Sequence, residues 1–149
     1  MAVAYKIVID CSDPHRLADF WAAALGYVVE DNSALVQALL DGGQVPEAAV
    51  TRARGVLAFS DGAGIRDPDH PFDPHTGIGR GGRVLFQKVP EAKVVKNRVH
   101  LDLHVGPEGR AEAVERLKGL GATVLWEAEQ GGKPWVTMAD PESNEFCVA

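Results

Sequence analysis

The order of the expected secondary-structure elements repeats once along the chain, and this repeat constrains the fold more than any single element does. In each half a strand leads into a helix, and three further strands follow. Each helix ends at a Leu-Gly pair, as is usual for a helix C-terminus, and each closing strand carries a phenylalanine. The corresponding pairs are Leu25-Gly26 and Leu120-Gly121, and then Leu85-Phe86 and Glu145-Phe146. We therefore expect an α+β fold of two βαβββ modules.

The first module covers about residues 1–90. A strand in 2–11 should place Tyr5, Ile7 and Ile9 on one face, and a helix should follow, with Pro14 at its first position after a Ser12 or Asp13 cap. Its apolar stripe includes Trp21. Further strands are expected at 27–30, 55–60 and 83–89, short helices at 33–40 and 46–54, and a long loop at 61–82. Residues 32–82 thus form a long insertion in this module.

The second module covers about residues 96–149, and the two modules together form a single domain. The stretch 96–105 alternates from Val99 onward, as a half-buried strand does. Its polar face carries His100, Asp102 and His104. Two interpretations remain open at this point: the face holds a ligand or metal, or it is exposed to solvent. A helix within 108–121 and strands at 122–126, 133–138 and 145–148 complete the module.

Composition excludes several classes of protein. The 149 residues are 46% apolar and 24% charged, which is typical of a globular domain, and the net charge is −6 with no basic run. Nucleic-acid binding requires clustered basic residues. No apolar stretch reaches the length of about 20 residues that a membrane helix needs, and no signal peptide is evident. The two cysteines lack metal-type spacing, so we expect reduced thiols and a cytoplasmic protein.

Two local motifs are weak. Gly77, Gly79 and Gly82 satisfy GxGxxG, but this run follows a loop and precedes a strand, whereas a dinucleotide site needs a strand before it and a helix after it. The acids and imidazoles of residues 67–75 are able to bind a cation, although such a loop is more often solvated. We favour the solvated loop.

Four stretches of the chain carry a family resemblance: DCSDPHRLADFWAAALGY, LFQKVPEAK, VKNRVHLDLHV and WVTMADPESNEFCV. They resemble the vicinal oxygen chelate superfamily of glyoxalase and bleomycin-resistance proteins, and most of all the small glyoxalase-like proteins common in actinobacteria. The resemblance implies a half-open curved sheet around a cleft. The family usually has glycine where Ser143 stands, so we expect strain in that turn.

Enzymes of this superfamily place metal ligands on the first and last strands of each module. The resemblance therefore implies His100 and Glu145 as ligands of a divalent Zn, Mn, Fe or Ni ion. In the first module the equivalent positions are Lys6 and Leu85, neither of which is a metal ligand. Because two ligands are too few for a closed site, the resemblance predicts an incomplete metal site.

The strand faces predict which polar side chains line the cleft, together with Leu85 and Cys147. Burial of unpaired charge is costly, so these side chains must pair, bind a ligand or stay hydrated. In the alternative structural interpretation, Lys6 and Asp10 pair with Glu145 or His100 and hold the modules together. The predicted cleft residues are Lys6, Asp10, Gln87, His100, Asp102, His104 and Glu145.

Two functions follow from these expectations. The first is a protein that binds a small molecule without a complete metal site, of the sequestering or resistance kind. The second is a divalent-metal-dependent lyase, isomerase or dioxygenase that uses His100 and Glu145. The resemblance also implies a homodimer, since small members of the family commonly dimerise. The sequence names neither the ligand nor the reaction.

Overall fold

The computed structural model describes residues 1–149 and divides them into two compact units, Met1–Glu91 (unit 1) and Ala92–Ala149 (unit 2). The fold is α+β, with three α-helices and open sheets of mixed strand direction, as predicted. No helix combines the length and apolar character that a membrane crossing requires. Each unit has its own sheet and its own core, and each is described separately below.

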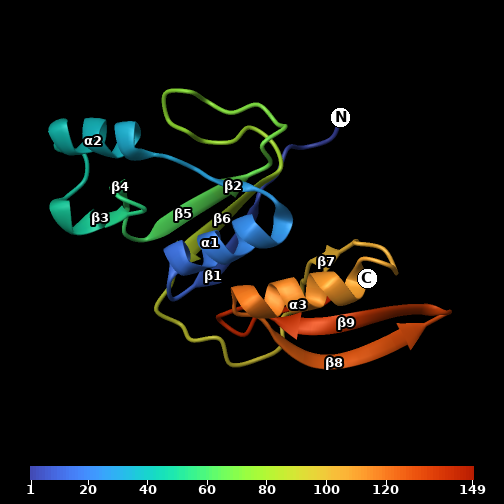
Figure 1. Cartoon of the computed structure of the whole chain (residues 1–149). Coiled ribbons are helices and arrows are strands. Elements are labelled where there is room, and N and C mark those ends of the chain that lie inside the picture. Colours follow the sequence, from blue (N-terminus) through green and yellow to red (C-terminus); the bar gives the residue numbers. More distant parts are fainter. The chain divides into compact units, whose positions relative to one another are not determined.

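The sheet of unit 1 has the strand order β1-β6-β5-β2. β1 runs parallel to β6, and the other two pairings are antiparallel. Helix α1 packs on this sheet against β5 and β6 (Figure 1). The strands are β1 (Ile7–Cys11), β2 (Val28–Val29), β5 (Gly62–Arg66) and β6 (Arg83–Lys88).

Helix α1 (Pro14–Leu25) begins and ends at the residues that the sequence indicates. The Asp13 carboxylate accepts a hydrogen bond from Arg16 N at 3.0 Å, and Gly26 closes the helix with φ +72°. The apolar stripe is buried, and Trp21 is only 3% exposed. The Trp21 ring meets the Phe20 ring edge to face at 5.3 Å between centroids. This aromatic pair is the largest apolar contribution of α1 to the core.

Strand β1 is shorter than the sequence predicts. It begins at Ile7 because its partner β6 starts to pair at Val84, so Tyr5 lies beyond the sheet and is exposed. Ile7 pairs with Val84, which is buried, and so it lies on the predicted side, although it is 37% exposed. The prediction that the strand includes Tyr5 is therefore wrong.

The inserted part of unit 1 contains helix α2 (Ser33–Asp41), a 3₁₀ turn (Glu47–Ala49) and the hairpin of β3 (Val50–Ala53) and β4 (Val56–Phe59). These elements form a lobe beside the main sheet (Figure 1), where α2 packs on β4. The helix predicted at 46–54 is present only as the 3₁₀ turn Glu47–Ala49, and the prediction is wrong over Val50–Ala53, which forms β3. The β-branched residues Val50 and Thr51 favour a strand, and the hairpin supplies the pairing partner.

The predicted loop at 61–82 is also wrong over its first part, because Gly62–Arg66 forms β5 in the centre of the sheet. Two glycines lower the strand propensity of this segment, so the sequence did not indicate a strand there. Gly64 is required by space, since a Cβ there would lie 2.0 Å from a carboxylate oxygen of Glu30. That buried carboxylate accepts hydrogen bonds from Arg83 Nε at 2.7 Å and from Gly79 N at 2.7 Å.

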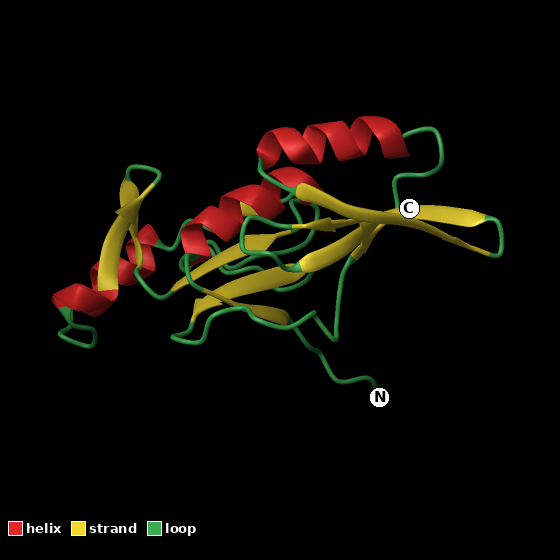
Figure 2. Cartoon of the chain, turned by 90° about the horizontal axis from the view of Figure 1, so that it is seen from below, coloured by secondary structure: helices red, strands yellow, loops and turns green.

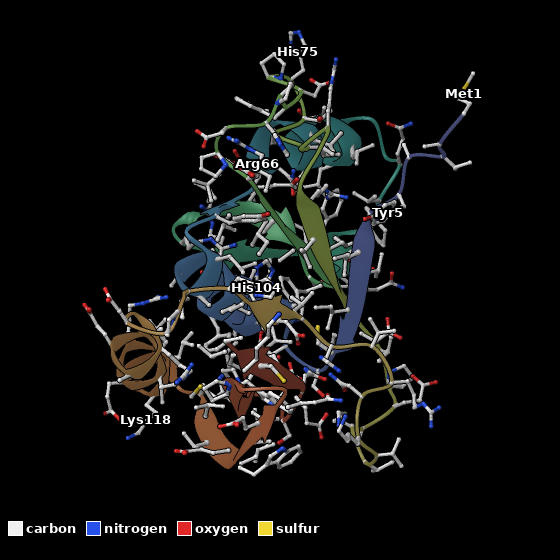
Figure 3. The ribbon with its side chains drawn as sticks, turned by 90° about the vertical axis from the view of Figure 1, so that its right-hand side faces the viewer. Met1, Tyr5, Arg66, His75, His104 and Lys118 are labelled. Carbon is white, nitrogen blue, oxygen red and sulfur yellow. The ribbon has the colours of Figure 1, made fainter.

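The remaining loop, 67–82, carries the cation-binding motif considered in the sequence. Its acids hold turns: Asp73 Oδ1 accepts from His75 N at 2.8 Å and from Thr76 N at 3.3 Å. These backbone N–H groups, together with Arg80, hold the pKa of Asp73 below its usual range against the effect of desolvation. His75 lies at the outer end of this loop (Figure 3). The loop assembles no group of three metal-ligand side chains.

The sheet of unit 2 has the strand order β7-β10-β9-β8. β7 runs parallel to β10, and the others are antiparallel. Helix α3 covers one side of this sheet (Figure 2), where its Leu117 is fully buried. The elements are β7 (Asp102–Leu103), α3 (Arg110–Leu120), β8 (Thr123–Gln130), β9 (Lys133–Ala139) and β10 (Glu145–Val148).

The strand predicted from Val99 is regular only over β7. The residues before Asp102 lie outside the paired register, in which only Asp102 and Leu103 are matched with Cys147 and Val148 of β10. Cys147 N still donates to Leu101 O at 2.9 Å, so the segment stays beside β10. The turn before β10 contains Ser143 at φ +69°, which agrees with the strain expected where the family has glycine.

Substitution of Trp21 by alanine should lower the free energy of unfolding by about 3–5 kcal/mol, because it leaves a large cavity under α1. Urea denaturation monitored by circular dichroism measures this loss. Trp126→Ala is a matched control, since Trp126 is 44% exposed, and it should cost much less. A loss for Trp21→Ala below about 1 kcal/mol would contradict the packing of α1.

Candidate functional site

The face of the unit 2 sheet opposite α3 carries a cavity of about 380 Å³. Alternation along β9 explains its position. Val136 and Met138 are buried in the core, so Trp135 and Thr137 lie on the other face. We call this the tryptophan cavity, and its lining includes Lys96, His100, Asp102, Trp126, Trp135 and Cys147.

Three potential ligand side chains meet in the tryptophan cavity. The ligand atoms of His100, Asp102 and Cys147 all lie within 4.8 Å of one another. His100 Nδ1 lies 2.8 Å from Asp102 Oδ1. A carboxylate only accepts, so Nδ1 carries the proton and Nε2 remains for a ligand. The sheet register produces this group, because Asp102 pairs directly with Cys147.

The thiol of Cys147 is held in its protonated form. Burial raises its pKa, and the negative charge of Asp102 raises it further. The Thr137 hydroxyl, 3.6 Å from Sγ, opposes this shift without reversing it. Because the thiolate is the nucleophile and the metal ligand, the thiol by itself is weakly reactive at neutral pH.

Glu145, predicted as a metal ligand, is engaged by the chain itself. Its carboxylate accepts from Lys93 Nζ at 3.1 Å and from Asn97 N at 2.9 Å. The same ammonium also donates to Val95 O. Desolvation alone would raise the pKa of Glu145, but the Asn97 N–H and the Lys93 ammonium outweigh it and hold the pKa below its usual value. Glu145 therefore anchors the segment that precedes β7.

The other predicted site residues lie outside the tryptophan cavity. His104 follows β7 and is exposed. In unit 1, Asp10 pairs with Gln87 across β1 and β6. Gln87 lines a separate cavity of about 380 Å³ in unit 1, and Arg83 lines the same cavity. The structure thus brings together His100 and Asp102, and Glu145 lines the same cavity.

The sheet register aligns the two modules. Asp10 pairs with Gln87 in unit 1, and Asp102 pairs with Cys147 in unit 2. Gln87 and Cys147 both directly follow the buried phenylalanine of their closing strand. Asp10 is therefore the counterpart of Asp102, and each module carries an aspartate at this position of its first strand.

This register corrects the equivalence inferred from the sequence. His100 lies two residues before Asp102, and Val8 lies two residues before Asp10. His100 therefore corresponds to Val8, and the equivalence of His100 with Lys6 that was inferred from the sequence is wrong. Lys6 lies before β1 and is exposed. The counterpart of Cys147 is Gln87, whose amide oxygen is a weak ligand for Zn or Fe. Unit 1 therefore offers neither an imidazole nor a thiol at the corresponding positions.

The donors of unit 2 partly fit a divalent metal. Imidazole, carboxylate and thiolate are the donors that zinc prefers, and all three are close enough to converge. His100 and Cys147 supply the imidazole and the thiol, and Asp102 either completes the set or orients the imidazole from behind. Three protein ligands are typical of a catalytic zinc site.

Sequence reasoning missed the aromatic walls of this site. Trp126 and Trp135 were expected only as strand residues, although both line the cavity. One signal was available for Trp135: it alternates with Val136 and Met138, as a residue on the opposite face must. Trp126 had no such signal, because a bulge between Val124 and Trp126 shifts the register of β8.

Replacement of Glu145 by glutamine should lower the free energy of unfolding at pH 7 by about 1–3 kcal/mol, since it removes a charged acceptor that is only 14% exposed. Because the pKa of Glu145 is lower in the folded chain than in the unfolded chain, its carboxylate stabilises the fold fully above the pKa of an unfolded glutamate. This contribution is lost as the pH falls through the lower folded value. Urea denaturation from pH 7 to pH 3 should show wild type and variant converge, and a constant difference would contradict the assignment.

No curated protein matches the chain. Solved structures match over nearly its whole length, and at their low sequence identities the likeness is one of fold. A hypothetical protein from S. aureus is 15% identical with a TM-score of 0.58, and the match covers 99% of this chain and 93% of that one.

Two further neighbours have named families. A glyoxalase/bleomycin resistance protein/dioxygenase family enzyme from Burkholderia phytofirmans is 15% identical, with a TM-score of 0.57 and coverage of 96% and 94%. The fosfomycin resistance protein FosX from Listeria monocytogenes, complexed with Mn(II) and 1S,2S-dihydroxypropylphosphonic acid, is 11% identical, with a TM-score of 0.58 and coverage of 99% and 89%. The family model described as a glyoxalase-like domain matches residues 6–149, and the chain belongs to this family.

Proposed function

We propose that the chain binds a small organic molecule in the tryptophan cavity and that this binding does not require a metal. The observation that carries the proposal is the lining of the cavity. Aromatic walls from Trp126 and Trp135 stand beside the polar pair of His100 and Asp102. Its volume of about 380 Å³ lies within the range of small-molecule sites. The apolar walls supply binding energy, and the polar pair supplies orientation.

Two observations support independence from a metal. The carboxylate of Glu145 is engaged by Lys93 and Asn97. Unit 1 contributes Val8 and Gln87 at the positions that correspond to His100 and Cys147. In this proposal the chain acts as a binding protein of the sequestering or resistance kind.

The second candidate function is a divalent-metal-dependent lyase, isomerase or dioxygenase. The observation in its favour is the convergence of His100, Asp102 and Cys147 within 4.8 Å. The FosX structure shows that a protein of this fold binds Mn(II). The three residues would hold the metal, which would supply a Lewis acid for a substrate oxygen. The hydrogen bond from His100 Nδ1 to Asp102 would fix the imidazole so that Nε2 faces the metal.

Protection of Cys147 from alkylation separates the two functions. In a Cys11→Ser variant the remaining thiol reports on the cavity, because Cys147 lines it. Fragments that are anionic, neutral or cationic are added in EDTA, and iodoacetamide labelling of Cys147 is followed by mass spectrometry. We expect at least one fragment to slow labelling, since access controls the rate at fixed thiol pKa. Protection that appears only after Zn²⁺ or Mn²⁺ is added would favour the metal-dependent enzyme instead.

We further propose that the chain forms a homodimer in the cytoplasm. Neither cysteine forms a disulfide, which agrees with a reducing compartment. Several apolar side chains of β8 are exposed, among them Val124 and Leu125, and β8 is an edge strand of its sheet. A twofold partner would cover such an edge. Sedimentation velocity at micromolar concentration should show a dimer, and a monomer alone would refute this part of the proposal.

A further inference from the structure

Two cavities of unit 2 adjoin one another and share two nitrogen-bearing side chains. The tryptophan cavity is one of them. The second, of about 500 Å³, is lined by Val95, Lys96, Asn97, Arg98 and His100, and we call it the basic cavity. Lys96 and His100 line both. A ligand that lies in the first cavity therefore has basic groups at one end.

In this region the acidic side chains are paired within the chain, whereas Lys96 and Arg98 are not paired with an acidic side chain. Glu145 is paired with Lys93 at 3.1 Å, and Asp102 is hydrogen-bonded to His100 at 2.8 Å. Both acidic side chains that line the tryptophan cavity thus already have a partner. Lys96 donates only to the carbonyl of its neighbour Asn97, at 3.4 Å, and the guanidinium of Arg98 stands exposed. The uncommitted charge is positive, although the chain as a whole carries −6.

The side of the tryptophan cavity formed by β8 and β9 is aromatic. Trp126 and Trp135 come from adjacent strands, and Trp126 pairs with Thr137, two residues from Trp135. Indole faces favour planar partners, which stack against them or meet them edge to face. The apolar and basic ends of the site thus select two different parts of one ligand.

We propose that the ligand is an aromatic anion, in which a planar ring system lies against Trp126 and Trp135 and a carboxylate, phosphonate or sulfonate group reaches Lys96. This inference rests on the proposed small-molecule function and names the ligand class of that site. The ammonium of Lys96 donates to the anion in a charge-assisted hydrogen bond. An aromatic cation would also suit indole faces, but it would meet Lys96 and Arg98 and find both carboxylates engaged.

Calorimetric titration with three probes of the same ring system tests the inference. The probes are 1-naphthoate, 1-naphthamide and 1-naphthylmethylammonium, each titrated in EDTA. We expect 1-naphthoate to bind about tenfold or more tightly than the other two, because a charged hydrogen bond to Lys96 is formed only by the anion. Cyclohexanecarboxylate, which lacks the aromatic ring, should bind more weakly than 1-naphthoate by about fivefold.

Two variants test whether the probe binds in the tryptophan cavity. Lys96→Gln should weaken 1-naphthoate by about fivefold or more and leave 1-naphthamide unchanged. Trp126→Leu should weaken both, by about fivefold. Lys118→Gln is the matched control, because Lys118 projects from α3 into solvent beside Glu115 (Figure 3) and lines neither cavity. It should leave every affinity unchanged, and circular dichroism confirms that each variant folds.

The outcomes distinguish this inference from the function on which it rests. Equal affinity for the anionic and neutral probes, with loss on Trp126→Leu, would overturn the anion class and leave small-molecule binding intact. Tighter binding of the cationic probe would overturn it in the same way. If none of the probes and none of the broader fragment panel protects Cys147 in EDTA, the proposed function itself fails.

Discussion

Strand β10 is the element on which the described site depends. It lies in the interior of the unit 2 sheet, parallel to β7 on one side and antiparallel to β9 on the other. Its alternation sends Phe146 and Val148 into the core, where they are 1% and 0% exposed. Glu145 and Cys147 must then lie on the opposite face. A shift of one residue in this register would exchange core and cavity, so burial of Phe146 fixes the chemistry of the site.

The two cavity-side residues of β10 have different roles. Glu145 engages Lys93 and Asn97 and so holds the segment before β7 against the strand. That segment carries Lys96, which therefore reaches both cavities. Cys147 meets the pair of His100 and Asp102 and remains a thiol because burial raises its pKa. A structural carboxylate and a protonated thiol thus come from alternate residues of β10 on one face.

The sequence predicted those features that depend on periodicity and capping. The helix at Pro14–Leu25 with its cap at Asp13, and the buried Phe86 and Phe146, follow from alternation and end signals. The sequence did not predict β5. The close approach of Glu30 requires glycine at position 64, and glycine has a low strand propensity. Sequence reasoning also gave Lys6 as the counterpart of His100, because strand register depends on pairing with a distant strand and cannot be read from the local sequence. Engagement of Glu145 by Lys93 is likewise a tertiary contact.

The central claim is that the tryptophan cavity takes a small organic molecule without a metal. The most direct measurement is two-dimensional ¹H–¹⁵N NMR of the indole N–H groups in EDTA, because the chain has three tryptophans. Two of them line the cavity, and Trp21 is buried in the core of unit 1 as an internal control. On titration with 1-naphthoate, the account predicts shifts for Trp126 and Trp135 and none for Trp21. Indole signals that move only after Zn²⁺ or Mn²⁺ is supplied would contradict it.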